Sequence, residues 1–502
     1  MNVGKALPRN AQHFPRKIAI VDKKRSLTYL EFHLRTNRLA NYLLEQGIAP
    51  GDPVGLACGN RSEHCEVLFA LAKIGAVAVP FDYHWTLREC DAMVNFFAPK
   101  AFILEERTET RDLEASLGDR LAPGRLIVID PKQAWSYEEA LSAAGSETPE
   151  LNVDGKDIFL IMITSGTTGF PKGCLVNHET YALRSMNNAI TKGFGQQERA
   201  LLTLPLHFNA GRGSMMGILY LGGTVFIQEK FDEEAFLGAI ERERITYTLL
   251  VPTLCDRLLG SNRLGSYDLS SLSYLGITSG HLSREAAAAM IERVCTGLYE
   301  AYASTDCGQI TILSPEDRSL RGDTVGRPIW CVLLKMVDEQ GEEIPMGEEG
   351  EICVRSPLAI QGYYRNPRAT EEFFHHGWCH TGDIGFLDAE GYLHVSGRKK
   401  NMIKSGGISI FPEEIEEVLL GHPAVADAAV IGFKSPDWGE AVKALVVLKD
   451  KTNCEAEILI GFCKEALAPY KAPKVVEFVA SLPRTAMGKI DRGRLESAIR
   501  RK

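Results

Sequence analysis

Apolar positions in the first 150 residues recur with two spacings, which predicts alternating helices and strands. Residues 30–46 and 63–73 repeat apolar side chains at helical spacing, and short apolar runs lie between and after them. Those runs have the length of buried strands and cover residues 53–57, 76–80, 101–104 and 126–129. The alternation favours an α/β sheet in this part of the chain.

The alternation resumes with residues 158–163, an unbroken apolar run typical of a fully buried strand. Helical spacing follows at residues 178–191 and 232–244. Further strands are expected at residues 200–205, 224–228, 246–251, 272–277 and 297–300. These elements predict a second parallel sheet. Loops that leave the ends of parallel strands are candidate walls of a ligand site.

A different pattern begins near residue 325, where short alternating strands with glycine-rich turns predict a small β-barrel or β subdomain. Pro412 with two following acids suits a helix start, strands are expected at 424–433 and 442–448, and a helix at 456–466. We therefore expect an α/β protein with a large N-terminal domain, residues 1–397, and a small α+β C-terminal domain, residues 398–502.

The chain has 502 residues, 45% of them apolar and 24% charged, as in ordinary globular enzymes of two or more domains. Its net charge of −9 argues against nucleic-acid binding, although residues 398–502 carry 18 Lys and Arg against 14 Asp and Glu. No signal peptide, membrane span or paired cysteine motif appears among its 12 cysteines, so a cytoplasmic protein with reduced thiols and no integral membrane association is expected.

The loop after residues 158–163 has the composition of a phosphate-binding segment. It combines hydroxyls, glycines and a lysine: Thr164, Ser165, Gly166, Thr167, Thr168, Gly169, Lys172 and Gly173. Glycines let backbone N–H groups turn toward an anion, and hydroxyls and a lysine add donors. It is not the Walker loop, which would need glycine where Pro171 stands. A polar surface turn is the alternative.

Five stretches taken together carry a resemblance: residues 164–173, 204–211, 302–306, 381–383 and 483–490. Their order and separation resemble the adenylate-forming superfamily of acyl-CoA synthetases, peptide-synthetase adenylation domains and luciferases, over roughly residues 15 to 495. The resemblance implies two steps: a carboxylate attacks the α-phosphate of ATP to give an acyl-adenylate and pyrophosphate, and a thiol then displaces AMP. Fixed cations and N–H donors must offset the assembled negative charge.

The same resemblance assigns an ATP site. The phosphate loop would wrap the β- and γ-phosphates, Asp383 and Arg398 would reach the ribose, and Lys489 would bridge the acid and the α-phosphate as the leading catalytic residue, with Thr164 and His207 as further catalytic candidates. Tyr302 would lie against the adenine, and Ser279, Gly280 and His281 would line its other side. The further ATP-binding residues implied are Ala301, Ala303, Ser304 and Thr305. Without the family pattern, Asp383 would read as a turn residue, Tyr302 as a core aromatic and Lys489 as a solvated cation.

The resemblance also implies an acyl pocket with His207 as a gate at its entrance. The alternative interpretation of His207 is a histidine packed in the core. The expected lining of the pocket is His207, Phe208, Asn209, Gly211, Arg212, Gly280 and Gly308. A solvent-facing Arg212 is the favoured alternative for that residue. Two departures from the family pattern stand out: Asp306 replaces the usual glutamate that would bind Mg²⁺, and His281 lies in the adenine loop. Asp306 is shorter by one methylene, so a water or a loop movement would be needed.

The family rotates its C-terminal domain between the two steps, which implies a mobile domain here with a hinge near Lys400. The alternative reading of Lys400 is a linker charge. The segment Lys404, Ser405, Gly406 and Gly407 would enter the site in the second step, where glycines allow a pantetheine arm to pass closely.

The sequence therefore predicts an AMP-forming acyl-CoA ligase that uses ATP, Mg²⁺, CoA and a small to medium carboxylic acid. The acid is left open among aliphatic, alicyclic, aryl and carnitine-like compounds, and a homodimer is left open as the assembly. An amino-acid adenylation domain is disfavoured because residues 205–213 contain no acidic residue and no carrier domain follows. An adenylation-only enzyme, a luciferase-like oxygenase and a degenerate ATP-binding regulatory protein stay as alternatives.

Overall fold

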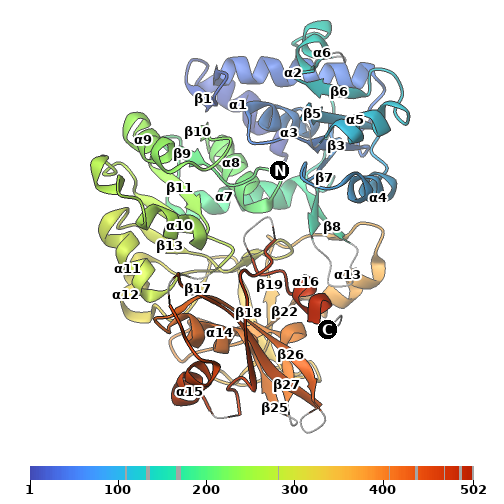
Figure 1. Ribbon diagram of the computed structural model, residues 1–502. Coiled ribbons are helices and arrows are strands. Elements are labelled where there is room, and N and C mark those ends of the chain that lie inside the picture. Colours follow the sequence, from blue (N-terminus) through green and yellow to red (C-terminus); the bar gives the residue numbers. More distant parts are fainter. Residues whose placement is uncertain are drawn as a thin grey trace. The chain divides into compact units, whose positions relative to one another are not determined.

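The computed structural model describes residues 1–107, 110–131, 136–164, 171–280, 282–405, 408–435, 439–450, 452–468, 470–485 and 489–499. It divides into two compact units (Figure 1). The first comprises residues 1–320, 328–332 and 355–379, and the second comprises residues 321–327, 333–354 and 380–502. The predicted domain boundary near residue 397 lies within the second unit and stays a prediction.

Two seven-stranded sheets form the framework of the first unit. One has the order β20-β8-β7-β4-β3-β5-β6, with β3 (Pro53–Ala57), β4 (Val77–Pro80), β5 (Ala101–Glu105), β6 (Leu126–Ile129), β7 (Ile158–Thr164), β8 (Lys172–Asn177) and β20 (Gly362–Tyr363). The other has the order β13-β12-β11-β9-β10-β1-β2, with β1 (Ile18–Val21), β2 (Ser26–Thr28), β9 (Arg199–Leu202), β10 (Thr224–Ile227), β11 (Tyr247–Leu250), β12 (Tyr274–Ile277) and β13 (Leu298–Glu300). Most neighbouring strands are parallel, and the pairs β1–β2, β7–β8 and β8–β20 are antiparallel. The predicted fold class is confirmed.

Helices of the first unit accompany both sheets (Figure 1). They are α1 (Ala6–His13), α2 (Tyr29–Glu45), α3 (Ser62–Ile74), α4 (Leu87–Phe97), α5 (Arg111–Gly118), α6 (Tyr137–Ala143), α7 (His178–Lys192), α8 (Asn209–Leu221), α9 (Glu233–Glu243), α10 (Pro252–Leu259), α11 (Arg284–Arg293), α12 (Pro315–Arg321) and α13 (Pro367–Phe373). Capping boxes begin α2, α4 and α6, where Thr28, Thr86 and Ser136 each pair with a glutamate three residues on. The four predicted helices in this unit are confirmed.

Helix α3 is buried along its whole length. A helix in such a place would normally be apolar on every side, yet α3 carries Glu63, His64, Glu66 and Lys73. Buried charges need partners, and α3 has them. Lys73 donates to Thr36 and Asn37 at 2.5 and 2.6 Å, and Glu66 accepts from Arg35 and Tyr137 at 2.6 and 2.7 Å.

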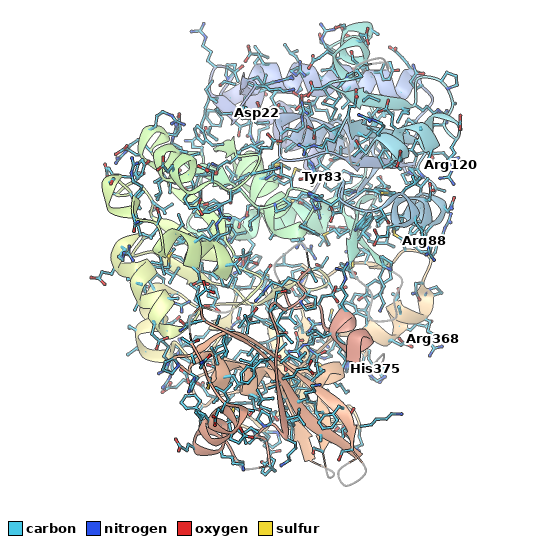
Figure 2. The ribbon with its side chains drawn as sticks, in the orientation of Figure 1. Asp22, Tyr83, Arg88, Arg120, Arg368 and His375 are labelled. Atoms are coloured by element: carbon cyan, nitrogen blue, oxygen red, sulfur yellow. The ribbon has the colours of Figure 1, made fainter. Side chains whose placement is uncertain are left out.

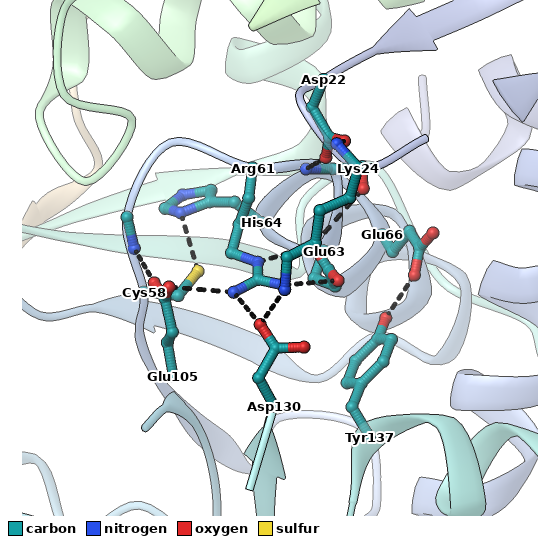
Figure 3. Close-up of polar contacts among 12 residues, drawn as sticks. Asp22, Lys24, Cys58, Arg61, Glu63, His64, Glu66, Glu105, Asp130 and Tyr137 are labelled. Atoms are coloured by element: carbon teal, nitrogen blue, oxygen red, sulfur yellow. Dashed lines mark hydrogen bonds and ion pairs between the residues drawn. The ribbon is translucent and has the colours of Figure 1, made fainter. Parts of the chain in front are cut away.

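The start of α3 anchors a larger ion-pair cluster, drawn in Figure 3. Arg61 contacts Glu63 at 2.7 Å and both Glu105 and Asp130 at 2.9 Å. Burial alone would raise the pKa of Glu105, but hydrogen bonds from Arg107 and from the Gly59 N–H outweigh it and lower that pKa. The pKa of Asp130 is lowered as well, because Lys24 and Arg61 outweigh its partial burial.

These shifts predict that acid destabilises the fold. A carboxylate with a depressed pKa in the folded state contributes stability that is present above its unfolded pKa of about 4 and is lost as pH falls through that range. Glu66 offsets part of the effect, because burial raises its pKa. Urea unfolding at about pH 7 and about pH 4 should give a smaller unfolding free energy at the lower pH. The difference should shrink in Arg61→Met, and an equal difference in that variant would contradict a role for the cluster.

The second unit contains two further sheets. The five-stranded sheet that corresponds to the predicted β subdomain includes β18 (Leu333–Val337), β19 (Gly350–Arg355), β22 (Trp378–Leu387) and β23 (Leu393–Arg398). The C-terminal sheet has β24 (Ile403–Ser405), β25 (Ile408–Ile410), β26 (Val425–Ser435), β27 (Gly439–Leu448) and β28 (Val475–Phe478), and its helices are α14 (Pro412–Leu420), α15 (Ala456–Ala466) and α16 (Arg492–Ile499). The predicted elements are present here too.

The cysteines agree with the expectation of reduced thiols. Ten of the twelve cysteines are buried, and none of the twelve, which all lie in described segments, is in a disulfide. Across the described residues, no helix is both long and apolar enough to cross a membrane.

Candidate functional site

The predicted phosphate loop joins two antiparallel strands of the first unit. Thr164 ends β7 and pairs with Lys172, which begins β8, and the Thr164 hydroxyl donates to the Lys172 carbonyl at 3.4 Å. Ser165, Gly166, Thr167, Thr168 and Gly169 lie outside the described residues. The Lys172 ammonium lies 4.8 Å from the ring centre of Tyr363. Tyr363 is therefore a neighbour of the loop that the sequence did not indicate.

Asp306, the predicted metal ligand, is held by the same tyrosine. The Tyr363 hydroxyl donates to Asp306 Oδ1 at 2.7 Å, and the Cys174 thiol donates to the same oxygen at 3.3 Å. Burial and the neighbouring carboxylate raise the pKa of Tyr363, so its proton stays in place. Partly buried Arg184 donates to the Thr305 and Asp306 carbonyls at 3.1 and 3.4 Å. Both the backbone and the side chain of Asp306 are thus fixed.

The predicted adenine walls lie at two strand ends of the first unit. Tyr302 follows β13, and its carbonyl accepts from the N–H groups of Ile310 and Thr311 at 2.9 and 3.2 Å. The next residues form a short hairpin of β14 (Ala303–Ser304) and β15 (Gly308–Gln309), which turns through Gly308 at φ +75°. Ser279, at the exit of β12, has a left-handed φ of 66°. A non-glycine residue in that region is uncommon and often marks a functional loop. His281 lies outside the described residues.

His207 and the start of α8 form the predicted gate and acyl pocket. His207 is 7% exposed, and its ring packs 4.2 Å from that of Phe208. The expectation that Arg212 faces solvent is wrong: its side chain is 1% exposed, and its Nη1 donates to the His207 carbonyl at 2.6 Å. A side chain on Gly211 would come within 2.7 Å of the Leu204 and Pro205 carbonyls, so this glycine serves a close backbone approach. Asn209 is the first residue of α8.

The predicted ribose and catalytic residues come together in the second unit. Asp383 on β22 is opposite Arg398 on β23, and Arg398 Nε lies 2.6 Å from Asp383 Oδ1. Asp383 is 4% exposed, whereas the Arg398 side chain is 45% exposed. Lys489 is close enough for both charges to act on it. Desolvation and then repulsion by Arg398 lower the pKa of Lys489, and Asp383 opposes them. The Asp383 carboxylate is therefore paired with Arg398 and also acts electrostatically on Lys489.

The predicted hinge residue and the segment predicted to enter the site in the second step come directly after Arg398 in the chain. Lys400 lies in the short 3₁₀ turn η3 (Lys399–Asn401). Lys404 and Ser405 belong to β24, where Lys404 pairs with Ser409 and Ser405 with Ile408 in the hairpin to β25. Gly406 and Gly407 lie outside the described residues. The roles assigned to this segment stay predictions.

Comparison with known proteins identifies the family. Residues 7–364 match the AMP-binding enzyme family, and residues 414–489 match the AMP-binding enzyme C-terminal domain. The chain belongs to the AMP-binding enzyme family. A feruloyl-CoA synthase of Amycolatopsis sp is 35% identical over 97% of this AMP-binding enzyme and 96% of the relative. An indoleacetate–CoA ligase of Aromatoleum aromaticum is 34% identical over 100% and 99% of the two chains.

Among solved structures, the amide bond synthetase McbA from Marinactinospora thermotolerans superposes on this AMP-binding enzyme with a TM-score of 0.89. The two are 28% identical, and each chain is covered over 99% of its length. The matched family confirms the resemblance carried by the five sequence stretches.

Several neighbours of the site were not predicted from sequence. Tyr363, Arg184 and Asp82 all contact predicted site residues. A usable signal existed only for Asp82, because Asp82, Tyr83 and His84 leave the end of a parallel strand, β4, where ligand sites gather. Within the described segments, no group of three or more His, Cys, Asp or Glu residues could hold a metal ion.

Proposed function

We propose that this AMP-binding enzyme is an ATP-dependent acid–thiol ligase that makes an acyl-CoA through an acyl-adenylate. The observation that carries the proposal is the grouping of Lys489, Arg398 and buried Asp383 in the second unit. Asp383 can accept hydrogen bonds from both hydroxyls of a ribose. Lys489 would then be placed beside the nucleotide's 5′ side, where a carboxylate and a phosphate must meet.

Each residue would act on a defined step. In the first, a carboxylate oxygen of the acid attacks the α-phosphorus, and the bond to the pyrophosphate oxygen breaks. Lys489 would lie against both anions and stabilise the charge that builds up between them. In the second step the sulfur of CoA attacks the acyl carbon, and AMP leaves with the bonding electrons. Lys172 and the hydroxyl-rich loop after Thr164 would hold the β- and γ-phosphates.

Asp306 fits a Mg²⁺ ion that arrives with ATP. Its Oδ1 is occupied by Tyr363 and Cys174, and among the described residues no hydrogen bond engages Oδ2. One carboxylate oxygen together with phosphate oxygens and waters is a common Mg²⁺ environment. When bound, the ion would neutralise phosphate charge.

Removing the Tyr363 hydroxyl is expected to weaken metal binding. Partners that orient a ligand carboxylate typically contribute tenfold or more to metal affinity, so Tyr363→Phe should lower Mn²⁺ affinity in the presence of ATP by about tenfold. Electron paramagnetic resonance of Mn²⁺ would measure this directly. Tyr364→Phe is the matched control, because Tyr364 packs against Phe96 and Phe97. Equal affinities in wild type and Tyr363→Phe would refute the assignment.

The acid class is proposed from the relatives. Feruloyl-CoA synthase and indoleacetate–CoA ligase are named for acids that carry an aromatic ring, and we favour an aryl or arylalkyl acid here. Exchange of radiolabelled pyrophosphate into ATP should be measured with ferulate, indoleacetate, benzoate, hexanoate, palmitate and carnitine. The proposal predicts the fastest exchange with one of the aromatic acids. No exchange with any acid would refute adenylate formation, and with it the ligase.

An amide synthetase is the second candidate, supported by the likeness to McbA. Such an enzyme would form the same adenylate but transfer the acyl group to an amine. The two candidates are separated by supplying CoA or a primary amine together with the best acid. The proposed ligase should release AMP in a CoA-dependent manner, and release that depends on the amine alone would favour the alternative.

A further inference from the structure

A carboxylate and two histidines meet beside the predicted acyl pocket. Asp82 follows the end of β4 and is 7% exposed. Its Oδ1 accepts from the His84 N–H and from His84 Nδ1, both at 2.9 Å, and lies 3.5 Å from Nε2 of His207. Tyr83, between Asp82 and His84 in sequence and labelled in Figure 2, is half-buried, and its ring centre is 5.4 Å from that of His207. Two segments distant in sequence, residues 82–84 and the stretch with His207, thus meet at one carboxylate oxygen.

The surroundings of His207 favour a neutral imidazole with its Nε2 facing Asp82. Burial lowers its pKa to about 4, Asp82 acts in the raising direction, and His84 and Arg212 act in the lowering direction. His64 and Tyr83 are further titratable side chains near the His207 ring. Within the described residues, neither ring nitrogen of His207 has a hydrogen-bond partner in good geometry besides this approach to Asp82. A proton on Nε2 would point at the carboxylate, which leaves the lone pair of Nδ1 available.

We propose that His207 is the base for the thiol step and that Asp82 is its positioning residue. This inference rests on the proposed acid–thiol ligase function. The S–H proton passes to Nδ1 of His207 as the sulfur bonds to the acyl carbon, and the bond from that carbon to the AMP phosphate oxygen breaks. The resulting imidazolium is paired with Asp82, and its proton is returned to solvent after AMP leaves.

The pairing of His207 with Asp82 would stabilise the buried imidazolium that forms in this step. An imidazolium in a buried position is costly unless an opposite charge is next to it. Asp82 supplies that charge, and His84 fixes the carboxylate from the solvent side, because its own side chain is 54% exposed. A carboxylate that orients a histidine also selects which ring nitrogen carries the proton.

The kinetic test separates a base from a structural residue. The acyl-adenylate is made from the acid that supports the fastest pyrophosphate exchange. It is bound to an excess of full-length wild-type or Asp82→Asn enzyme, and a single turnover is started by adding either CoA or hydroxylamine. Hydroxylamine attacks as a neutral amine and needs no prior deprotonation. Thioester formation should slow by roughly ten- to a hundredfold, the size of a general-base contribution, while hydroxamate formation changes by less than about twofold. Asp91→Asn, a surface carboxylate paired with Arg120 at 3.0 Å, should change neither rate.

Equal loss of both products in Asp82→Asn, or no loss of thioester formation, would overturn the proposal. A second measurement does not depend on the acid. Nitrogen-15 spectra of histidine-labelled protein, with His207 assigned from His207→Gln, should show the Nε2-protonated tautomer in wild type near neutral pH, and loss of that preference in Asp82→Asn. Finding the Nδ1-protonated tautomer in wild type would refute the pairing of His207 with Asp82. Failure of every acid to exchange pyrophosphate would refute the proposed ligase function, and the two outcomes are independent of each other.

Discussion

Replacing Lys489 with alanine should lower the rate of adenylate formation by roughly a hundredfold or more, the loss expected when one preorganised transition-state donor is removed. The reason is local. Asp383 and Arg398 already neutralise each other at 2.6 Å, so Lys489 is the cation of this group whose charge is left for the acid and the α-phosphate. Thioester formation from supplied acyl-adenylate should be nearly unchanged, since the phosphate bond has then already been broken.

The two half-reactions should be measured separately in the same variant. Pyrophosphate exchange reports the first, and quenched-flow analysis of synthetic adenylate with CoA reports the second. Arg494→Ala is a matched control, because it removes an exposed cation from the same tail that pairs with Asp491 at 3.3 Å. Equal falls in both half-reactions would contradict a role confined to the first step. Such a result would also remove the main reason for expecting a mobile C-terminal domain with a hinge near Lys400.

Element positions were predictable wherever the chain marks both ends of an apolar segment. Strand β6, Leu126–Ile129, and helix α15, Ala456–Ala466, match the expected ranges residue for residue. Helix α8 was missed, because residues 206–211 were interpreted only as the segment that follows the strand expected at 200–205. Gly211 is needed where α8 passes close to the Leu204 and Pro205 carbonyls.

Candidate site residues could be named from the sequence where a short motif carries them. Thr164, Asp383 and Lys489 each lie in a stretch that the family pattern indicates, and Asp383 and Lys489 do come together. Tyr363 was not predictable, because it contacts Asp306 across 57 residues and lies in no motif. The burial of Arg212 was missed for a related reason. Arginine is usually exposed, and the burial of Arg212 depends on the packing of α8 against α7 and on other parts of the chain distant in sequence.

The largest effect on stability is expected from Arg61→Met. The Arg61 side chain is 9% exposed, and it contacts Glu63 and Glu105, whose side chains are 2% and 12% exposed (Figure 3). Methionine of similar length would fill the space and leave these carboxylates without their shared cation. Breaking a buried ion pair in this way typically costs about 3 to 5 kcal/mol of unfolding free energy. Urea unfolding followed by circular dichroism would measure the loss.

Lys24→Met tests whether burial, rather than the number of ion pairs, gives Arg61 its importance. Lys24 also pairs with Asp130, but its side chain is 53% exposed, and exposed pairs contribute at most about 1 kcal/mol. The two variants therefore remove one cation each from the same cluster at very different depths. If Arg61→Met cost no more than Lys24→Met, the cluster at the start of α3 would have to be regarded as a hydrated surface network. Arg25, which contacts Glu63 at 2.9 Å, would then be sufficient to hold that carboxylate.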